Sequence, residues 1–335
     1  MARAVGRAAT YEAPPNIALV KYWGVRDRER VLPYNSSVSV TLERLRSRTT
    51  VRFDAELRED RVELNGAVAS GGPREGVVRF LDRVRALAGV TDGAEVRSRN
   101  NFPTASGLAS SASGFAALAG ASTAALGLSL SGRELSRLAR FGSGSASRSV
   151  FGGFVEWRAG VRPDGSDCYA RPLYGPDHWP ALVDLVAIVR GAPVKEVRSK
   201  DAMQATVATS PVYRRRLAEL PGRIRRIRAA IGARDARRLF PLVMEECDSF
   251  REVCETTRPS LDYLTTTSRA ILGEVRALNR EAGRPVAAYT HDAGAHVHVF
   301  TLVRDAGRVR RRLSRLPGVE RTEMLRPGPG GHLVR

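Results

Sequence analysis

The chain has 335 residues, of which 43% are hydrophobic and 27% are charged, close to the averages of globular proteins. This length allows one large or two ordinary domains to bury a core without a disulfide or a structural metal. No apolar run approaches the roughly 18 residues that a membrane span requires, and the first residues contain no apolar stretch of secretory length. We therefore expect neither a membrane protein nor an exported one.

The basic residues outnumber the acidic ones by 54 to 35, which gives a formal charge of +19. Such an excess of positive charge is typical of proteins that bind nucleic acid. The arginines, however, are spread through several predicted helices, as in RVRALAG, RIRRIRAA and RVRRRLSRL, instead of gathering in one stripe. We therefore expect no nucleic-acid partner, and RNA binding stays an alternative that salt-sensitive binding would support.

Cysteine and lysine are both rare in this sequence. The scattered Cys168, Cys247 and Cys254 fit neither a disulfide framework nor a metal site, which indicates reduced thiols and a cytoplasmic protein. Lysine occurs only three times among many arginines, so the surviving lysines mark places that need a compact ammonium group. These lysines are Lys21, Lys195 and Lys200.

The first hundred residues are predicted to be rich in β-strands. Runs of β-branched residues bounded by turn formers indicate strands, with a helix near residues 76–88 and a further strand near 94–98. The order does not follow a βαβ alternation. The strand candidates are NIALVKYWG, SSVSVTL, RTTVRFDA and DRVELNG.

Two helices follow, and then the strand patterns return. Small residues predict a long helix from Gly107, and the next helix begins at Ser131 as N-cap with Glu134 three residues later. Strand patterns resume at FGGFVEWRAG and ALVDLVAIVR.

The second half is predicted to be mainly helical, with a hairpin near its end. Helices are expected from residue 199 to about 282, a hairpin over 285–303 and a helix over 306–316. The closing RPGPGGHL is interpreted as a short turn-rich segment. These elements predict an α+β protein with an N-terminal domain over residues 1–185 and a C-terminal domain over 186–335.

The segment NFPTASGLASSASGF, residues 101–115, combines serines and glycines with little side-chain bulk. Several backbone N–H groups and hydroxyls at a helix start, with the helix dipole, favour a bound polyphosphate, and the hydroxyls can also reach Mg²⁺. The alternative is a tight helix-packing seam of small residues. No Gly-Lys-Ser/Thr follows, so this is not a Walker loop.

A second polar loop, FGSGSASRSVFGG, contains Ser143, Ser145 and Arg148. The arginine fork suits a carboxylate or a phosphate. The alternative is a serine-rich turn with an ordinary surface arginine.

Six segments in a fixed order resemble the diphosphomevalonate decarboxylase family, within the superfamily of galactokinase, homoserine kinase and mevalonate kinase. The resemblance runs from about Ala13 to about Val303. Its signatures are NIALVKYWG, LPYNSSVSVTL, NNFPTASGLASSASGFAAL, GSGSASRSVFGGFVEW, AMQATVATSP and AYTHDAGAH.

The resemblance implies a fold and a reaction. The fold has a ribosomal-protein-like α+β N-terminal domain that binds ATP, a ferredoxin-like α+β C-terminal domain and a cleft between them, commonly in a homodimer. The reaction uses ATP and Mg²⁺ to phosphorylate the 3-hydroxyl of mevalonate 5-diphosphate, and that phosphate departs as CO₂ leaves, giving isopentenyl diphosphate.

The resemblance also implies roles for individual residues. The catalytic residues are Asp292, Arg148 and Lys21, with the arginine keeping the carboxylate ionised; His291 and His296 are not required by the match. The substrate contacts are Asn16, Tyr22, Ser143, Ser145, Arg148, Ser199 and Lys200. The ATP contacts are Pro103, Gly107, Leu108, Ala109, Ser110 and Ser111, the last of which also binds the metal.

One position departs from the family pattern. The family usually reads Lys-Tyr-Trp-Gly-Lys, whereas Val25 follows Gly24 here, which removes a cation from the diphosphate end of the pocket. Either Arg26 or another arginine compensates, or the substrate carries less charge. We expect mevalonate 5-diphosphate as the substrate, with a phosphomevalonate decarboxylase or a mevalonate 3-kinase-like enzyme as alternatives.

Overall fold

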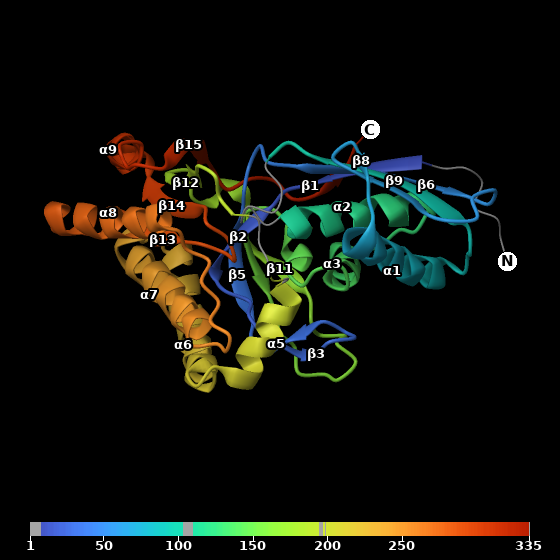
Figure 1. The fold of residues 1–335 in the computed structure, drawn as a ribbon, viewed down its shortest axis with the longest axis horizontal. Helices are drawn as coiled ribbons and strands as arrows, with labels where there is room; N and C mark the ends of the chain where they lie inside the picture. The colour runs from blue at the N-terminus through green and yellow to red at the C-terminus, as the bar shows by residue number, and fades with distance from the viewer. Residues whose placement is uncertain (1–7, 103–109, 194–196, 198, 335) are drawn as a thin grey trace.

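The computed structural model describes residues 8–102, 110–193, 197 and 199–334. Three main sheets and their helices form an elongated molecule, with the first sheet at one end, the third at the other and β2 and β5 between them (Figure 1). This is the α+β architecture that the sequence predicts. None of the helices within the described ranges is both long and apolar enough to cross a membrane.

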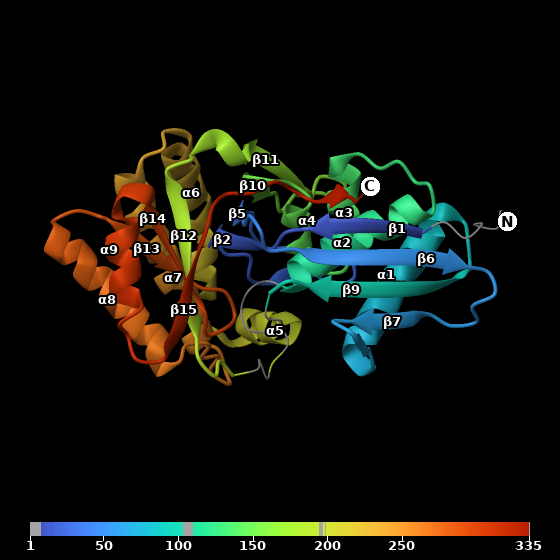
Figure 2. The ribbon, with the colours of Figure 1, turned by 90° about the horizontal axis from the view of Figure 1, so that it is seen from above.

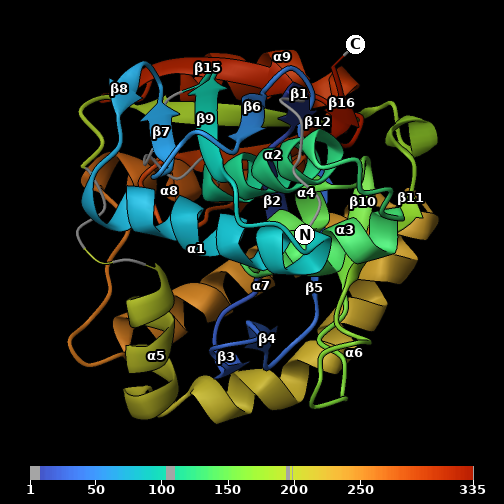
Figure 3. The ribbon, with the colours of Figure 1, turned by 90° about the vertical axis from the view of Figure 1, so that its right-hand side faces the viewer.

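The first sheet has six strands in the order β16-β1-β6-β9-β7-β8. Along β6, buried residues alternate with more exposed ones, so only one face of the sheet enters the core. Helices α1, α2 and α3 cover that face (Figure 3). The strands are β1 (Ala8–Ala13), β6 (Ser47–Asp54), β7 (Arg61–Leu64), β8 (Ala67–Val68), β9 (Gly93–Asn100) and β16 (His332–Leu333), and the helices are α1 (Gly71–Ala88), α2 (Ser110–Ala125) and α3 (Gly132–Arg140).

The small residues of α2 serve close packing along the body of the helix. A Cβ on Gly120 would lie 2.2 Å from the ring of Tyr11 on β1, so only glycine allows this approach. The buried Ser113 hydroxyl lies 2.6 Å from the hydroxyl of Ser47 and also belongs to the packing. The packing-seam alternative therefore holds for the helix body, while Ser111 in the first turn stays exposed.

The second sheet, in the order β11-β10-β5-β2, lies at the centre of the molecule. Every residue of its edge strand β2 is buried. Asn16 is the first residue of this strand, and Lys21 directly follows its last residue. The strands are β2 (Asn16–Val20), β5 (Ser37–Thr41), β10 (Phe154–Trp157) and β11 (Ala170–Tyr174); a short hairpin of β3 (Val25–Asp27) and β4 (Leu32–Pro33) and the short helices α4 (Ala146–Ser149) and η1 (Pro176–His178) complete this part.

The third sheet has the order β13-β14-β12-β15 and is covered on both faces. On one face, residues such as Leu185 and Val299 pack against α8 and α9. On the other, Val186 and Phe300 share a core with α6, α7 and strands β2 and β5 of the second sheet, so one apolar core joins the two halves. The elements are β12 (Leu182–Val189), α5 (Ser199–Thr209), α6 (Tyr213–Gly232), α7 (Ala236–Glu255), α8 (Thr266–Ala282), β13 (Ala287–Thr290), β14 (Val297–Leu302), α9 (Val303–Leu313) and β15 (Val319–Leu325).

Local sequence signals explain several helix ends. Ser131 caps α3 in a capping box with Glu134, as predicted. The helix predicted near residues 76–88 begins earlier, at Gly71, and the last helix covers residues 303–313 where the sequence predicts 306–316.

The closing segment differs from its prediction as a turn. Residues 332 and 333 form β16, which pairs with β1 through Tyr11 opposite Leu333 and Glu12 opposite His332. Before it, the N–H group of Gly328 donates to the carbonyl of Thr41. The chain therefore returns from the third sheet to the first (Figure 2). The sequence does not indicate this return, because the prolines and glycines before β16 are typical of a turn. A domain division near residue 185 stays a prediction, and this tail crosses it.

Candidate active site

Lys21 and Asp292 meet where β2 and β13 end. The ammonium group of Lys21 donates to Oδ1 of Asp292 at 2.7 Å and to the carbonyl of Ala18 at 2.8 Å. Lys21 is 2% exposed, whereas the carboxylate side chain of Asp292 is 25% exposed. A buried cation thus holds a carboxylate that a ligand can still reach.

The electrostatic surroundings keep Asp292 ionised. Burial by itself raises the pKa of this carboxyl, but the charge and hydrogen bond of Lys21, together with the charge of Arg148, hold the pKa below its ordinary value. At neutral pH, Asp292 is therefore a carboxylate that can accept a proton.

Arg148, on α4, is the second buried cation near this carboxylate. Burial lowers its pKa to about 10, and the charge of Asp292 opposes this shift, so the guanidinium stays charged at neutral pH. Its Nε donates to Oδ1 of Asn16 at 2.9 Å, and its NH1 donates to the hydroxyl of Ser37 at 2.7 Å. Arg148 is therefore close enough to Asp292 for their charges to act on each other, and the roles that the resemblance implies for both residues stay a prediction.

Asn16 orients Arg148 through bonds within the protein. Its Nδ2 donates to the hydroxyl of Ser149 at 2.8 Å and to the carbonyl of Ser145 at 3.2 Å. A contact of Asn16 with substrate stays a prediction. Ser37 and Ser149 were not predicted as site residues; for Ser37, the available signal was a serine at a buried position of the SSVSV strand.

A row of hydroxyls connects the two polar loops. The hydroxyl of Ser111, in the first turn of α2, lies 3.5 Å from that of Ser143, which lies 3.2 Å from that of Ser145. The positive end of the α2 dipole is at the same place. Ser110 is half-buried beside Ser111. The remaining predicted ATP contacts, Pro103, Gly107, Leu108 and Ala109, lie outside the described residues.

The loop around Ser143 also approaches Tyr22. The ring of Tyr22 packs edge-on against Trp157, with centroids 4.7 Å apart. A Cβ on Gly144 would lie 2.7 Å from both rings. Glycine at this position therefore lets the serine loop lie directly against the segment that follows Lys21.

Ser199 and Lys200 lie at the start of α5, and Lys200 is exposed. The helix is placed by Ala202 and Met203, which pack with Trp23 in an apolar cluster that also touches Ala293. The same cluster thus connects α5 to the segments that carry Lys21 and Asp292. Contact of Ser199 and Lys200 with substrate stays a prediction.

The position that departs from the family pattern lies at the border of this cluster. Val25 is partly buried against it and pairs with Pro33 in the small β3–β4 hairpin. Arg26 is exposed and donates to the carbonyls of Ala159 and Gly160 at 3.5 and 3.3 Å. Its role as a replacement cation stays a prediction.

His291 and His296 are neutral packing residues. Burial lowers the pKa of each to about 4. His291 is hydrogen-bonded to the carbonyl of Asp292, and the N–H group of Val189 donates to Nδ1 of His296. Both side chains are therefore used in contacts within the protein.

The chemistry available here is proton transfer beside an anion site. The ionised Asp292 lies near two buried cations, and the row of hydroxyls at the start of α2 is connected to Arg148 through Ser145 and Asn16. Among the described residues, no group of three or more His, Cys, Asp or Glu could hold a metal ion. A metal at this site would therefore need oxygen ligands from a ligand's phosphates in addition to hydroxyls.

Comparison with known proteins identifies the family. Residues 13–170 match the diphosphomevalonate decarboxylase-like N-terminal domain, and residues 185–325 match the mevalonate 5-diphosphate decarboxylase C-terminal domain. The diphosphomevalonate decarboxylase of Ganoderma lucidum is 42% identical over 312 residues, which cover 88% of this chain and 78% of that protein.

Solved structures agree over nearly the whole chain. A structure of MDDEF in complex with MVAPP, AMPPCP and magnesium is 37% identical, with a TM-score of 0.92 over 99% of this chain and 100% of that chain. A structure of the mevalonate diphosphate decarboxylase from Enterococcus faecalis is 36% identical, with a TM-score of 0.90 and the same coverage. These matches confirm the resemblance seen in the sequence and its two-domain fold. The chain therefore belongs to the diphosphomevalonate decarboxylase family.

Proposed function

We propose that this protein catalyses the ATP-dependent decarboxylation of mevalonate 5-diphosphate to isopentenyl diphosphate, with release of ADP, phosphate and CO₂. The observation that carries the proposal is the ionised, partly exposed Asp292, paired with Lys21 and facing the charge of Arg148. The similar structures in complex with MVAPP and an ATP analogue support this substrate pair.

In the first step, Asp292 accepts the proton of the 3-hydroxyl while the γ-phosphoryl group of ATP moves to that oxygen. A tertiary alcohol is a crowded nucleophile, so a carboxylate within hydrogen-bond reach lowers the barrier. The phosphoryl group itself needs positioning and positive charge more than covalent help. Arg148 supplies that charge, and Asn16 and Ser37 fix the direction of its guanidinium.

In the second step, the C3–O bond breaks and its electron pair leaves with phosphate. The bond between the carboxyl carbon and C2 then breaks, CO₂ departs, and the electrons of that bond form the C2=C3 double bond. A leaving phosphate dianion is stabilised by nearby cations, and Lys21 and Arg148 are the two buried ones described above. The same residues therefore serve both steps.

We assign the nucleotide phosphates to the start of α2. The exposed hydroxyl of Ser111 at the positive end of the helix fits a phosphate or a magnesium ligand, with Ser110 and Ser143 beside it. Mg²⁺ bound there by Ser111 and the phosphates would neutralise charge on the transferring group. Tyr22, Ser145, Ser199 and Lys200 complete the proposed substrate contacts.

The decisive experiment incubates the purified protein with ATP, Mg²⁺ and, separately, mevalonate, its 5-phosphate and its 5-diphosphate. We expect ADP, phosphate and CO₂ in equal amounts from the 5-diphosphate. Formation of ADP without CO₂ would identify a kinase that stops after the first step. CO₂ from the 5-phosphate alone would identify the phosphomevalonate decarboxylase.

We further propose a cytoplasmic homodimer whose residues 1–185 bind the nucleotide and whose residues 186–335 carry the catalytic aspartate. Three buried cysteines without disulfides support a reducing compartment, and the family resemblance supports the dimer. Light scattering coupled to gel filtration measures the oligomeric state, and a monomer at micromolar concentration would contradict it.

A further inference from the structure

The peptide of Lys21 is held on both sides by side chains. Its N–H group donates to Oε1 of Glu246 at 2.9 Å, and its carbonyl accepts from Nδ2 of Asn35 at 3.0 Å. Both partners are buried. Because this residue follows the last residue of β2, these side chains replace the ladder bonds that a longer strand would provide.

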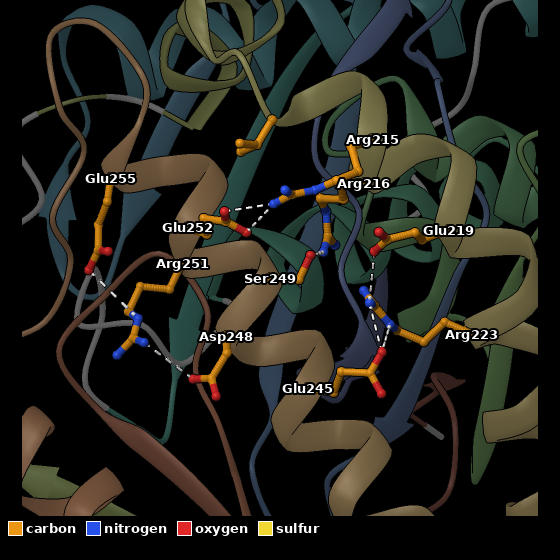
Figure 4. A pocket seen from close by; sticks show the side chains of 11 residues that line it. Arg215, Arg216, Glu219, Arg223, Glu245, Asp248, Ser249, Arg251, Glu252 and Glu255 are labelled. Atoms are coloured by element: carbon orange, nitrogen blue, oxygen red, sulfur yellow. Dashed lines mark hydrogen bonds and ion pairs between the residues drawn. The ribbon is translucent and has the colours of Figure 1, made fainter.

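Glu246 lies on α7 and is fully buried together with two arginines of α6. Arg216 and Arg223 are 2% and 3% exposed, and both donate to the carboxylate of Glu246, Arg223 at 2.7 Å. Figure 4 shows the outer side of this helix pair, where Arg223 also meets the neighbouring Glu245. Two guanidinium groups thus fix the carboxylate that accepts the Lys21 N–H group.

Trp23, the residue after Tyr22, is also held by side chains. The hydroxyl of Tyr213 donates to the carbonyl of Trp23 at 2.8 Å, and the indole N–H of Trp23 donates to the hydroxyl of Thr206 at 3.0 Å. Gly24 then turns the chain with a φ of 98°. Helices α5, α6 and α7 therefore each contribute a side chain that bonds to the segment between Lys21 and Gly24, and these side chains lie outside the proposed catalytic centre.

We propose that Glu246, supported by Arg216 and Arg223, is a positioning residue that aims the ammonium of Lys21 at Asp292. This inference deepens the proposed function and rests on it for its kinetic consequence. A carboxylate buried among arginines only to join α6 to α7 would need no contact with β2, yet its Oε1 accepts the Lys21 N–H group. Burying these charges is costly, and apolar residues would join the helices equally well.

The test compares Glu246→Gln with Glu245→Gln. Glu245 pairs with the same arginine but has no hydrogen bond to Lys21, so it is the matched control. The chain has only three lysines, and selective ¹³C labelling of the lysine ε-carbons gives at most three signals. Lys195→Arg and Lys200→Arg assign the Lys21 signal by elimination. We expect that signal to move in Glu246→Gln and to stay unchanged in Glu245→Gln.

Kinetics supply the second measurement. Because small displacements of a catalytic group cost up to about a hundredfold in rate, we expect kcat of Glu246→Gln to fall about 10- to 100-fold, with KM changed less than about threefold. Glu245→Gln should retain kcat. Because the oxygen of glutamine can still accept the Lys21 N–H group, the deciding comparison uses the triple variant described next: equal kcat values in that folded variant and in the control would overturn the proposal.

Glu246→Gln leaves buried arginines with less compensating charge, so the variant can lose stability. The variant in which Arg216, Glu246 and Arg223 are all replaced by Met removes the charges together, which proteins tolerate better. It should fold, shift the Lys21 signal and lose kcat to a similar extent. An unmoved Lys21 signal in this variant overturns the proposal. The signal is measured without substrate, so it separates failure of this inference from failure of the proposed reaction.

Discussion

The ammonium of Lys21 lies 2.7 Å from the carboxylate of Asp292, and this ion pair joins the second sheet to the loop that follows β13. Its two members are separated by 271 positions in the chain. The carboxylate of Asp292 in one half of the molecule is therefore held by a cation from the other half. Any displacement of the halves relative to each other changes the basicity of Asp292.

Asp292→Asn should abolish turnover and leave nucleotide binding intact. The amide cannot accept the proton of the 3-hydroxyl, and general-base contributions of this kind are about 10²- to 10⁴-fold. CO₂ release measures turnover, and calorimetric titration with an ATP analogue measures binding. Asp82→Asn, an exposed aspartate on α1, is the control and should behave as the parent protein. Substantial turnover by Asp292→Asn would remove the carboxylate from the mechanism.

Lys21→Met should shift the acid limb of the kcat/KM profile to higher pH. Burial raises the pKa of Asp292 and Lys21 counteracts it, so losing the ammonium lets the pKa rise. The base is then protonated, and activity is lost, at a higher pH than in the parent protein. The measurement is the pH dependence of kcat/KM in both proteins, and superimposable acid limbs would contradict the assignment.

Gly120→Ala should destabilise the protein although it raises helix propensity. The new methyl would lie 2.2 Å from the Tyr11 ring, and overpacking of this kind costs about 1–3 kcal/mol. Gly114→Ala, in the same helix but with no atom within 4 Å of the added Cβ, should instead be neutral or stabilising by up to about 1 kcal/mol. Urea unfolding of both variants measures the difference, and equal midpoints would contradict the packing argument.

Acid should weaken the fold partly through His296. Its pKa in the folded protein is about 4, below the ordinary value of 6.5, so the unfolded chain binds the proton first. This contribution to stability is present above pH 6.5 and is lost as the pH falls towards 4, by about 1–3 kcal/mol.

Urea unfolding at a series of pH values measures that loss. His296→Asn keeps an acceptor for the Val189 N–H group but cannot be protonated, so its stability should depend less on pH. His332→Asn, at an exposed position, should follow the parent protein. Parallel pH dependences of all three proteins would exclude this role of His296.

Val25→Lys should raise the preference for mevalonate 5-diphosphate over the 5-phosphate. It restores a cation beside Trp23, where the family pattern has one, and a charge-assisted contact contributes about 1.5–3 kcal/mol. Val25→Met, which adds length without charge, is the control. The ratio of kcat/KM for the 5-diphosphate to kcat/KM for the 5-phosphate measures the preference. An unchanged ratio would show that the residue at position 25 does not contribute to recognition of the second phosphate.

The sequence predicts the local features of this structure better than the long-range ones. The Ser131 capping box follows from residues three positions apart, and the expectation that Arg148 lies near Asp292 follows from the resemblance of their two motifs to the family. The Lys21–Glu246 bond was not predicted, because a glutamate in a helix is ordinarily exposed. The close approach of Gly120 to Tyr11 was not predicted either, since its partner lies on a distant strand.

The pairing of β16 with β1 has a consequence for synthesis on the ribosome. Until residues 332 and 333 leave the exit tunnel, β1 has an unpaired edge. The first sheet therefore reaches its final form only after the third sheet has been translated. Before that pairing forms, the chain exposes an open strand edge to its neighbours, and open strand edges favour aggregation.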